Sequence, residues 1–238
     1  MEKIIKINIK SALGSFKKPQ SNNNHSSFNI IPKSTLIGII GAVVGLDRNY
    51  MREFNVYKFL SENIQYSIKL NKPFIKKYWS EYGYNLANKK QSGRSLYTPD
   101  KFERIVDIDY DVCIKFNDEN KDINIILNNF ISNLKNEVSI FPTYMGMANF
   151  VNDITFIGEF QSELKHGEFK SKYFVTDLDM SKDIDFTNIM SEDLPTKSLD
   201  YLVYDYKSYK NIYFNDKCED LFAVGDYYLI DDECVEFI

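Results

Sequence analysis

Apolar and polar residues alternate in several separate stretches of the chain. Residues 4–10, 63–70 and 104–116 place apolar side chains mainly at every second position, and the apolar-rich stretch 150–160 follows later. A period of two is typical of a β-strand that buries one face. These four stretches are therefore predicted to be strands, with residues 104–116 alternating most strictly.

Two other stretches carry helical patterns. Residues 122–134 place apolar side chains at the i, i+3 and i+4 spacing of a helix with one buried face. Residues 32–46 become almost continuously apolar after an opening of Pro32, Lys33, Ser34 and Thr35. A hydroxyl of Ser34 or Thr35 can cap the free amides of a helix start, so a second, buried helix is predicted here.

Two segments between these elements are irregular. Residues 11–27 are polar, contain Gly14 and Pro19, and predict a loop. Residues 71–103 have no periodicity but many aromatic and basic side chains, and they lie between two predicted strands. They predict an extended β-hairpin arm with residues 91–93 as its flexible tip.

The order of the elements indicates an α+β fold. Strand, helix, strand, arm, strand, helix and strand follow one another over residues 1–162, which matches a ferredoxin-like sandwich with an insertion at about 71–104. Residues 163–238 are acidic and rich in Tyr and Phe, and they predict a β-rich C-terminal subdomain.

The net charge of −5 hides an asymmetry between the two parts of the chain. Residues 1–110 hold 18 Lys and Arg against 9 Asp and Glu, whereas residues 111–238 hold 11 against 25. A basic part of this kind points to a polyanion partner. The alternative is that the two parts intermix in the fold, so that the asymmetry cancels in space.

Composition limits the class of protein. A hydrophobic fraction of 44% and an aromatic fraction of 15% supply a buried core. The three cysteines are widely separated and form no CxxC pair, which favours a reducing cytoplasm over a disulfide framework or a zinc site. The longest apolar stretch, residues 36–46, is about half the length that a membrane span needs. We expect a soluble cytoplasmic protein without membrane association.

Two patches of sequence resemble one CRISPR-associated family. The first comprises residues 14–19 (GSFKKP), 27–28 (SF) and 32–46 (PKSTLIGIIGAVVGL), and the second is residues 141–146 (FPTYMG). They are similar to the fifth Cas family of the RAMP superfamily, a subunit of the type I Cascade complex, with a general similarity to type I-B. By order of elements the resemblance covers about two thirds of the chain, and it is weak in the last third.

The resemblance implies a fold, a function and partners. It implies a ferredoxin-like, RRM-like palm with a protruding β-hairpin thumb. Members of the family hook the 5′ handle of crRNA, cap the foot of the backbone filament and contact the large subunit, so that target DNA is engaged only indirectly. We therefore expect a non-catalytic RNA-binding subunit in antiviral defence that needs no cofactor. The alternative is a metal-independent endoribonuclease that processes pre-crRNA, as in one subtype of the family.

Candidate RNA contacts lie on the first loop, the first helix and the arm. Phe16 can stack on a base beside the cations Lys17 and Lys18, and the helix start can dock a phosphate. Basic and aromatic residues interleaved on the arm suit single-stranded RNA. The full set is Phe16, Lys17, Lys18, Lys33, Ser34, Thr35, Lys89, Lys90, Arg94, Tyr97 and Lys101. The alternatives are that Phe16 anchors the core, that Ser34 and Thr35 only cap, and that some arm aromatics pack beneath the hairpin.

Other motifs point away from catalysis and metal binding. The only histidines are His25, in the polar loop, and His166, near a predicted turn at Gly167, so a general acid and base for RNA cleavage are hard to assemble. Asp107, Asp109 and Asp111 share one predicted strand face and could hold Mg²⁺, but salt bridges to lysines are favoured.

The glycines at positions 38, 41 and 45 lie on one predicted helical face. A phosphate-binding loop is excluded because no Gly-Lys-Ser/Thr sequence follows. The spacing therefore predicts close packing of that helix against another backbone, which would offset the helix-destabilising effect of glycine.

Overall fold

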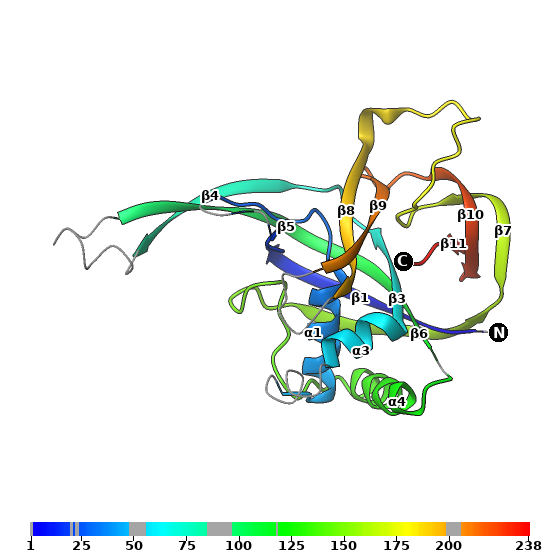
Figure 1. Cartoon of the computed structure of the whole chain (residues 1–238), viewed down its shortest axis with the longest axis horizontal. Helices are drawn as coiled ribbons and strands as arrows, with labels where there is room; N and C mark the ends of the chain where they lie inside the picture. The colour runs from blue at the N-terminus through cyan, green and yellow to red at the C-terminus, as the bar shows by residue number, and fades with distance from the viewer. Residues whose placement is uncertain are drawn as a thin grey trace.

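A mostly antiparallel sheet organises the fold (Figure 1). The computed structural model describes residues 2–19, 21, 24–47, 56–84, 97–117, 119–198 and 206–238. The strands of this sheet are β1 (Glu2–Gly14), β2 (Asn24–His25), β3 (Ile64–Leu70), β4 (Lys76–Tyr84), β5 (Tyr97–Phe116) and β6 (Asp153–Ser162). Across the body the order is β6-β1-β5-β3, with every neighbouring pair antiparallel. The predicted strands at 4–10, 63–70, 104–116 and 150–160 are confirmed.

Both faces of β1 are covered near its start, where Ile4, Ile5, Lys6 and Ile7 are all buried, so the prediction that this strand buries only one face is wrong there. Ile5, Ile7 and Ile9 lie in the main hydrophobic core, whereas Ile4 lies in a second cluster on the opposite face. All four side chains are 0% exposed. The strand also runs on to Gly14, so the predicted loop at 11–27 is wrong for its first residues.

Three helices lie together below the sheet in Figure 1. They are α1 (Lys33–Val44), α3 (Val56–Asn63) and α4 (Lys121–Lys135). The predicted helices at 32–46 and 122–134 are confirmed, whereas α3 was not predicted. The side chain of Asn120 caps α4 by accepting from the backbone of Asp122 and Ile123. The predicted capping of α1 by Ser34 or Thr35 is wrong, because Pro32 occupies the cap position and no side chain caps the helix.

Gly38, within α1, and Gly45, just after it, differ in how closely other residues pack against them. Gly45 follows the helix with a φ of 83°, and a Cβ there would lie 2.7 Å from the Cδ1 of Ile140. At Gly38 a Cβ would meet only the hydroxyl of Tyr57 at 3.5 Å, which is ordinary contact. Close packing is thus found at Gly45 and not at Gly38. At this end of the helix the amide of Phe141 also donates to the carbonyl of Ala42 at 3.0 Å.

The last third of the chain is β-rich, as predicted. A three-stranded sheet is formed by β7 (Leu164–Ser171), β10 (Leu221–Ile230) and β11 (Glu233–Val235), and a hairpin by β8 (Ile189–Ser198) and β9 (Tyr206–Asn215). A short 3-10 helix, Phe186–Asn188, precedes β8. Leu194, Ile212 and Ile238 belong to the main core, so this region and residues 1–162 share one interior.

Strand β5 is long enough to belong both to the sheet order β6-β1-β5-β3, here called the body, and to a hairpin with β4, here called the arm. Its second half pairs with β1 and β3, and its first half pairs with β4 from Ile105 and Lys76 to Tyr97 and Tyr84. The β4–β5 hairpin projects to the left of the body in Figure 1. Residues 91–93, the predicted tip, lie outside the described residues.

The strict alternation predicted for 104–116 is wrong at one point. Asp107 has a φ of 55°, and Ile105 and Ile108 on either side of it are both buried in the main core. The pairing of β5 with β1 keeps its register across this point, so the alternation is interrupted by the local backbone conformation of Asp107. None of the described helices is both long and apolar enough to pass through a bilayer.

Candidate nucleic-acid interface

The loop after β1 and the segment before β6 are in direct contact, although 130 residues separate them in sequence. The amide of Ser15 donates to the carbonyl of Met145 at 3.1 Å. A Cβ on Gly146 would lie 1.9 Å from the carbonyl oxygen of Ser15, and its φ is 85°. Only glycine fits this position without a shift of the backbone. The two sequence patches identified above thus form one structural unit.

Phe16 is part of this unit and is buried. Its exposed fraction is 2%, and it belongs to the main core. The prediction that Phe16 stacks on a base is therefore corrected, because a ring packed in the core offers no face to RNA. The alternative interpretation, a core anchor, describes its position.

A buried carboxylate fixes the same loop to the base of the arm. Glu103, 5% exposed, accepts a hydrogen bond from the amide of Ser27 at 2.8 Å and pairs with the Nζ of Lys76 at 2.7 Å. Lys76 also donates to the Asn29 side chain at 2.9 Å. A buried charge is stable only when it is paired and hydrogen-bonded, and this one is both. The loop therefore has a defined position beside β5.

The two lysines of the loop differ. The Nζ of Lys18 lies 2.5 Å from Glu192 and 5.4 Å from the centroid of the Phe28 ring. Its charge is thus balanced within the protein. Lys17 is exposed and forms no ion pair with another described residue, so of the two it is the one available to a phosphate.

The start of α1 is less accessible than the sequence indicated. Lys33 is 5% exposed, donates to the carbonyl of Ser61 at 3.4 Å and lies 6.0 Å from the centroid of the Tyr66 ring. The prediction that Lys33 docks a phosphate is corrected for this reason. Ser34 and Thr35 are partly exposed, and the structure does not test their predicted contact with RNA.

Aromatic and basic side chains gather on one face of the arm base. Trp79 of β4 pairs with Phe102 of β5, which pairs on its other side with His25 of β2. Two residues away from Trp79 and Phe102, Lys77 pairs with Arg104. Residues that pair on neighbouring strands share a face of the sheet, in the antiparallel pair β4–β5 and in the parallel pair β2–β5 alike, so these side chains form one continuous surface. Trp79 is 47% exposed, and Lys77 is also exposed.

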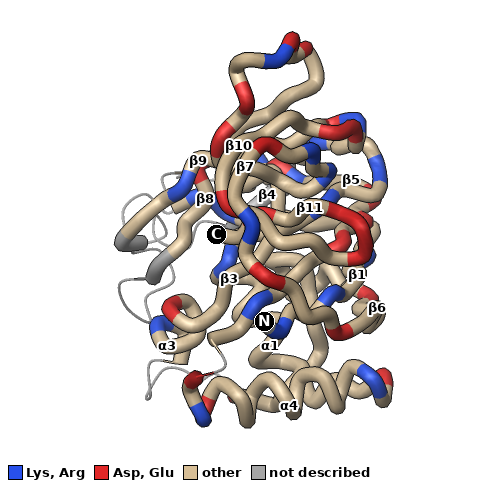
Figure 2. The backbone as a smooth tube through the Cα atoms, turned by 90° about the vertical axis from the view of Figure 1, so that its right-hand side faces the viewer, with Lys and Arg blue, Asp and Glu red and all other residues tan. Residues whose placement is uncertain are grey.

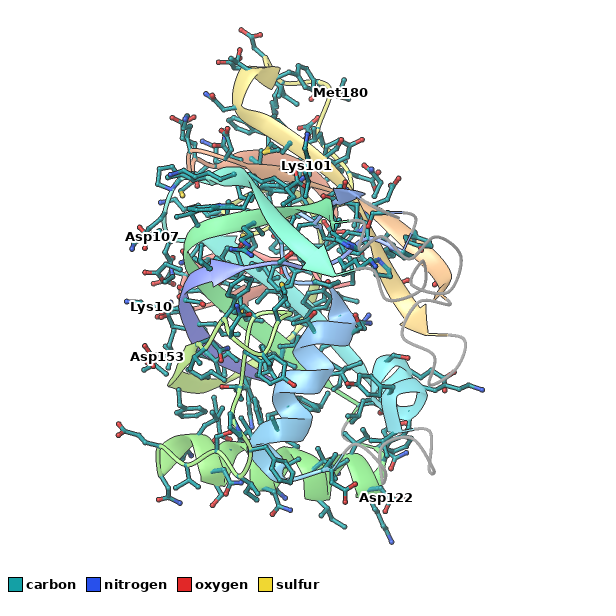
Figure 3. All side chains as sticks on the ribbon, turned by 90° about the vertical axis from the view of Figure 1, so that its left-hand side faces the viewer. Lys10, Lys101, Asp107, Asp122, Asp153 and Met180 are labelled. Carbon is teal, nitrogen blue, oxygen red and sulfur yellow. The ribbon has the colours of Figure 1, made fainter. Side chains whose placement is uncertain are left out.

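Only some of the arm residues that were predicted to contact RNA lie among the residues that the structure describes. Lys101 is exposed and pairs with Ser80 (Figure 3). Tyr97 is the first residue of β5, but its side chain lies outside the described residues, as do Lys89, Lys90 and Arg94 entirely. Sequence reasoning counted Lys77 among the basic residues of the arm but did not assign Phe102 or Arg104 to the site. In the sequence, Phe102 and Arg104 are two residues apart, as are Lys77 and Trp79. This spacing shows that the four side chains share a face only once the register of β4 on β5 is known.

The aspartates of β5 are held by hydrogen bonds and salt bridges. Asp109 accepts from the side chains of Asn8 and Asn71 and lies 3.4 Å from Lys10, and Asp107 lies 2.7 Å from Lys72. Burial raises the pKa of Asp109, but these donors outweigh burial and leave the pKa below its ordinary value. Figure 3 shows Asp107 and Lys10 on the same side of the molecule. The described residues include no cluster of His, Cys, Asp and Glu suited to a metal ion.

The two histidines occupy different parts of the fold. His166 lies in β7 rather than near a turn, and its Nδ1 is 2.8 Å from the Asp226 carboxylate. In Figure 1, β7 is at the opposite end of the molecule from the arm. His25 lies at the arm base, where its ring stacks on Phe102 with centroids 4.4 Å apart.

The charge asymmetry of the sequence cancels in part in the fold. Lys6 and Lys69 both reach Glu233, at 3.2 Å and 2.8 Å, and Lys18 reaches Glu192. The alternative that the two parts intermix is thus correct for these residues. Figure 2 shows acidic residues concentrated at the turn between β10 and β11, whose exposed members include Asp231 and Asp232.

The chain matches no known family model and no curated protein sequence. Its fold, however, is found in solved structures. The crystal structure of a CRISPR protein from Archaeoglobus fulgidus has a TM-score of 0.55 and 12% identity, covering 98% of each chain. A chain of a CRISPR RNA-guided surveillance complex has a TM-score of 0.50 and 10% identity, covering 94% of this chain and 89% of that chain. At these identities the likeness establishes that this protein shares their mixed α+β fold.

Proposed function

We propose that this chain is a non-catalytic RNA-binding subunit of a type I CRISPR surveillance complex. In this proposal it binds the 5′ handle of crRNA, caps the backbone filament and contacts the large subunit, in a complex of the I-B type. The observation that carries it is an arm whose base presents exposed Lys77, Lys101 and Trp79, on a fold shared with a chain of an RNA-guided surveillance complex. Exposed cations beside an aromatic ring suit single-stranded nucleic acid.

The arrangement of the strands supports the proposed architecture of a palm and a thumb. A ferredoxin-like sheet has its first strand in the middle, flanked by the third and fourth, with helices between strands one and two and between strands three and four. The observed order β6-β1-β5-β3, with α1 and α3 before β3 and α4 before β6, fits this plan. The β4–β5 hairpin would then be the thumb.

The acidic C-terminal region supports the proposed contact with the large subunit. Exposed carboxylates such as Asp226, Asp231 and Asp232 would repel RNA, so we assign this surface to a basic protein partner.

The decisive experiment is to purify the chain with its native neighbours and to sequence the RNA that accompanies it. Short RNAs that share one 5′ sequence are the expected result. A preparation that retains its protein partners but contains no RNA would contradict the proposal and would indicate a protein-interaction scaffold.

One observation favours the endoribonuclease as a second candidate. His25 lies on the proposed RNA surface, where an imidazole could act as a general acid or base. Incubating precursor RNA with the protein in the presence of a metal chelator separates the two candidates. Cleavage that is lost in His25→Ala but kept in His166→Ala would establish the enzyme, whereas intact RNA would support the binding subunit.

A further inference from the structure

Three aromatic rings form a single row across three adjacent strands at the base of the arm. His25, Phe102 and Trp79 occupy paired positions on β2, β5 and β4. The rings of His25 and Phe102 are stacked, with centroids 4.4 Å and planes 25° apart. The row therefore extends an existing ring stack toward the outer strand of the arm, where Trp79 is 47% exposed.

The outer ring of this row is supported from within the protein. The guanidinium of Arg104 lies 5.8 Å from the Trp79 ring and 5.2 Å from the Phe150 ring. Arg104 is only 8% exposed, so its cation packs between these rings rather than reaching into solvent. A cation at this distance is attracted to an aromatic face and holds the ring in place. Trp79 is thus presented with one face supported and much of its surface open.

We propose that the row His25–Phe102–Trp79 is a stacking platform for unpaired bases of single-stranded RNA. This inference rests on the proposed RNA-binding function and adds the residues on which the unpaired bases stack. Every base has a π-face that can stack on an aromatic ring, but in a duplex these faces already stack on one another. Aromatic side chains on neighbouring strands bind bases in this way in other RNA-binding sheets. Exposed Lys77, two residues from Trp79, is placed to neutralise a phosphate.

The test uses the fact that Trp79 is the only tryptophan in the chain, so that tryptophan emission reports on this site alone. The full-length protein is titrated with a short single-stranded RNA and, separately, with the same sequence as a duplex. Fluorescence anisotropy of labelled RNA measures binding, and tryptophan emission measures stacking. We expect the single strand to quench Trp79 and the duplex to leave its emission unchanged.

Substitutions separate stacking from charge. Trp79→Leu should raise the Kd for single-stranded RNA by about 5- to 150-fold, the loss of one stacked base, without changing the salt dependence. Trp79→Phe should restore most of the affinity. Lys77→Ala should instead reduce the slope of log Kd against log salt by about 0.7. The control is Phe186→Leu, which removes another exposed aromatic ring, on the segment before β8, and should leave binding unchanged.

The outcomes also distinguish this inference from the proposed function. Tight RNA binding with unchanged Trp79 emission and a wild-type Kd for Trp79→Leu would overturn the platform but leave RNA binding intact. Equal quenching by the duplex would overturn the preference for unpaired bases. A chain that binds no RNA at all would overturn the proposed function and the platform together.

Discussion

Gly146 lies where the loop after β1 packs on the segment before β6. Its φ of 85° belongs to the left-handed region, and a Cβ there would lie 1.9 Å from the Ser15 carbonyl oxygen. Any other residue at position 146 would therefore destabilise the fold in two ways, by straining its own backbone and by displacing the Ser15 carbonyl. The contact positions the loop that carries exposed Lys17, so a single glycine links stability to the proposed RNA surface.

Gly146→Ala is predicted to lower the free energy of unfolding by about 3 kcal/mol. Chemical denaturation at neutral pH measures this change. The matched control is Gly38→Ala, because a Cβ at Gly38 meets only the Tyr57 hydroxyl at 3.5 Å. That variant should gain up to about 1 kcal/mol from helix propensity. Wild-type stability for Gly146→Ala would show that the Ser15–Met145 contact is not rigid.

At the scale of elements, the sequence predicts those helices and strands whose type follows from the spacing of their own apolar residues. The helix at α4 and the strands β1 and β3 follow directly from apolar spacing. What could not be predicted depends on partners distant in sequence. Three features arise only when strands and loops pack together. They are the left-handed backbone conformation of Asp107, the pairing of Glu103 with Ser27 and Lys76, and the burial of Lys33 beside Tyr66.

The candidate site likewise has features that the local sequence predicts and features that depend on partners distant in sequence. The sequence indicated the arm as a whole because basic and aromatic residues are frequent there. It did not indicate which of them share a face, because that depends on the register of β4, β5 and β2. Phe16 and Lys33 were misassigned for a related reason: neither an aromatic ring nor a cation reveals from sequence whether its side chain is buried.

The arm is predicted to bind phosphates along its length. Replacing Lys89, Lys90 and Arg94 with alanine should weaken RNA binding and should lower the slope of log Kd against log salt by about 0.7 for each lost contact, because fewer counterions are released. Anisotropy titrations at several salt concentrations measure both effects. A control triple variant removes Lys58, Lys121 and Lys165, which are exposed on the body. If the arm variant keeps the wild-type slope, the arm does not bind phosphates.

At the scale of the whole molecule, the C-terminal region is built into the core rather than attached to it. The amide of Tyr66 donates to the carbonyl of Ile238 at 3.1 Å, and the amide of Ile238 donates back at 3.2 Å. The last residue thus extends the pairing of β3. Truncation near residue 163 would also remove Leu194 and Ile212 from the main core, so the roles of this region are better tested by single substitutions.

Glu233 links the β10–β11 turn to the main sheet through two poorly exposed lysines. Its carboxylate lies 2.8 Å from the Nζ of Lys69 on β3 and 3.2 Å from that of Lys6 on β1. Burial raises the pKa of Glu233, but the two lysines outweigh burial and leave the pKa below its ordinary value of 4.5. Burial lowers the pKa of Lys69, but Glu233 and Asp111 outweigh it and leave that pKa above 10.5.

These directions fix the pH range in which the link stabilises the fold. A carboxylate whose pKa is lowered by folding stabilises the native state above its ordinary pKa and loses this contribution as pH falls through the folded value. A lysine whose pKa is raised stabilises below its ordinary pKa and loses the contribution as pH rises through the folded value. The link between Glu233 and Lys69 is therefore fully present from about pH 5 to about pH 10.

Glu233→Gln is predicted to destabilise the protein by about 2 kcal/mol at pH 7, because Lys6 and Lys69 keep their charge but lose their shared partner. The difference from wild type should shrink as the pH falls below 4.5 and through the lower pKa that Glu233 has in the folded protein, because the carboxylate then loses its charge. Urea denaturation at pH 7 and near pH 3.5 measures both values. Asp231→Asn is the control, since Asp231 has a 63% exposed side chain 3.7 Å from Lys6 and should contribute little. A Glu233→Gln defect of equal size at both pH values would contradict the prediction, because the defect would then not depend on the charge of Glu233.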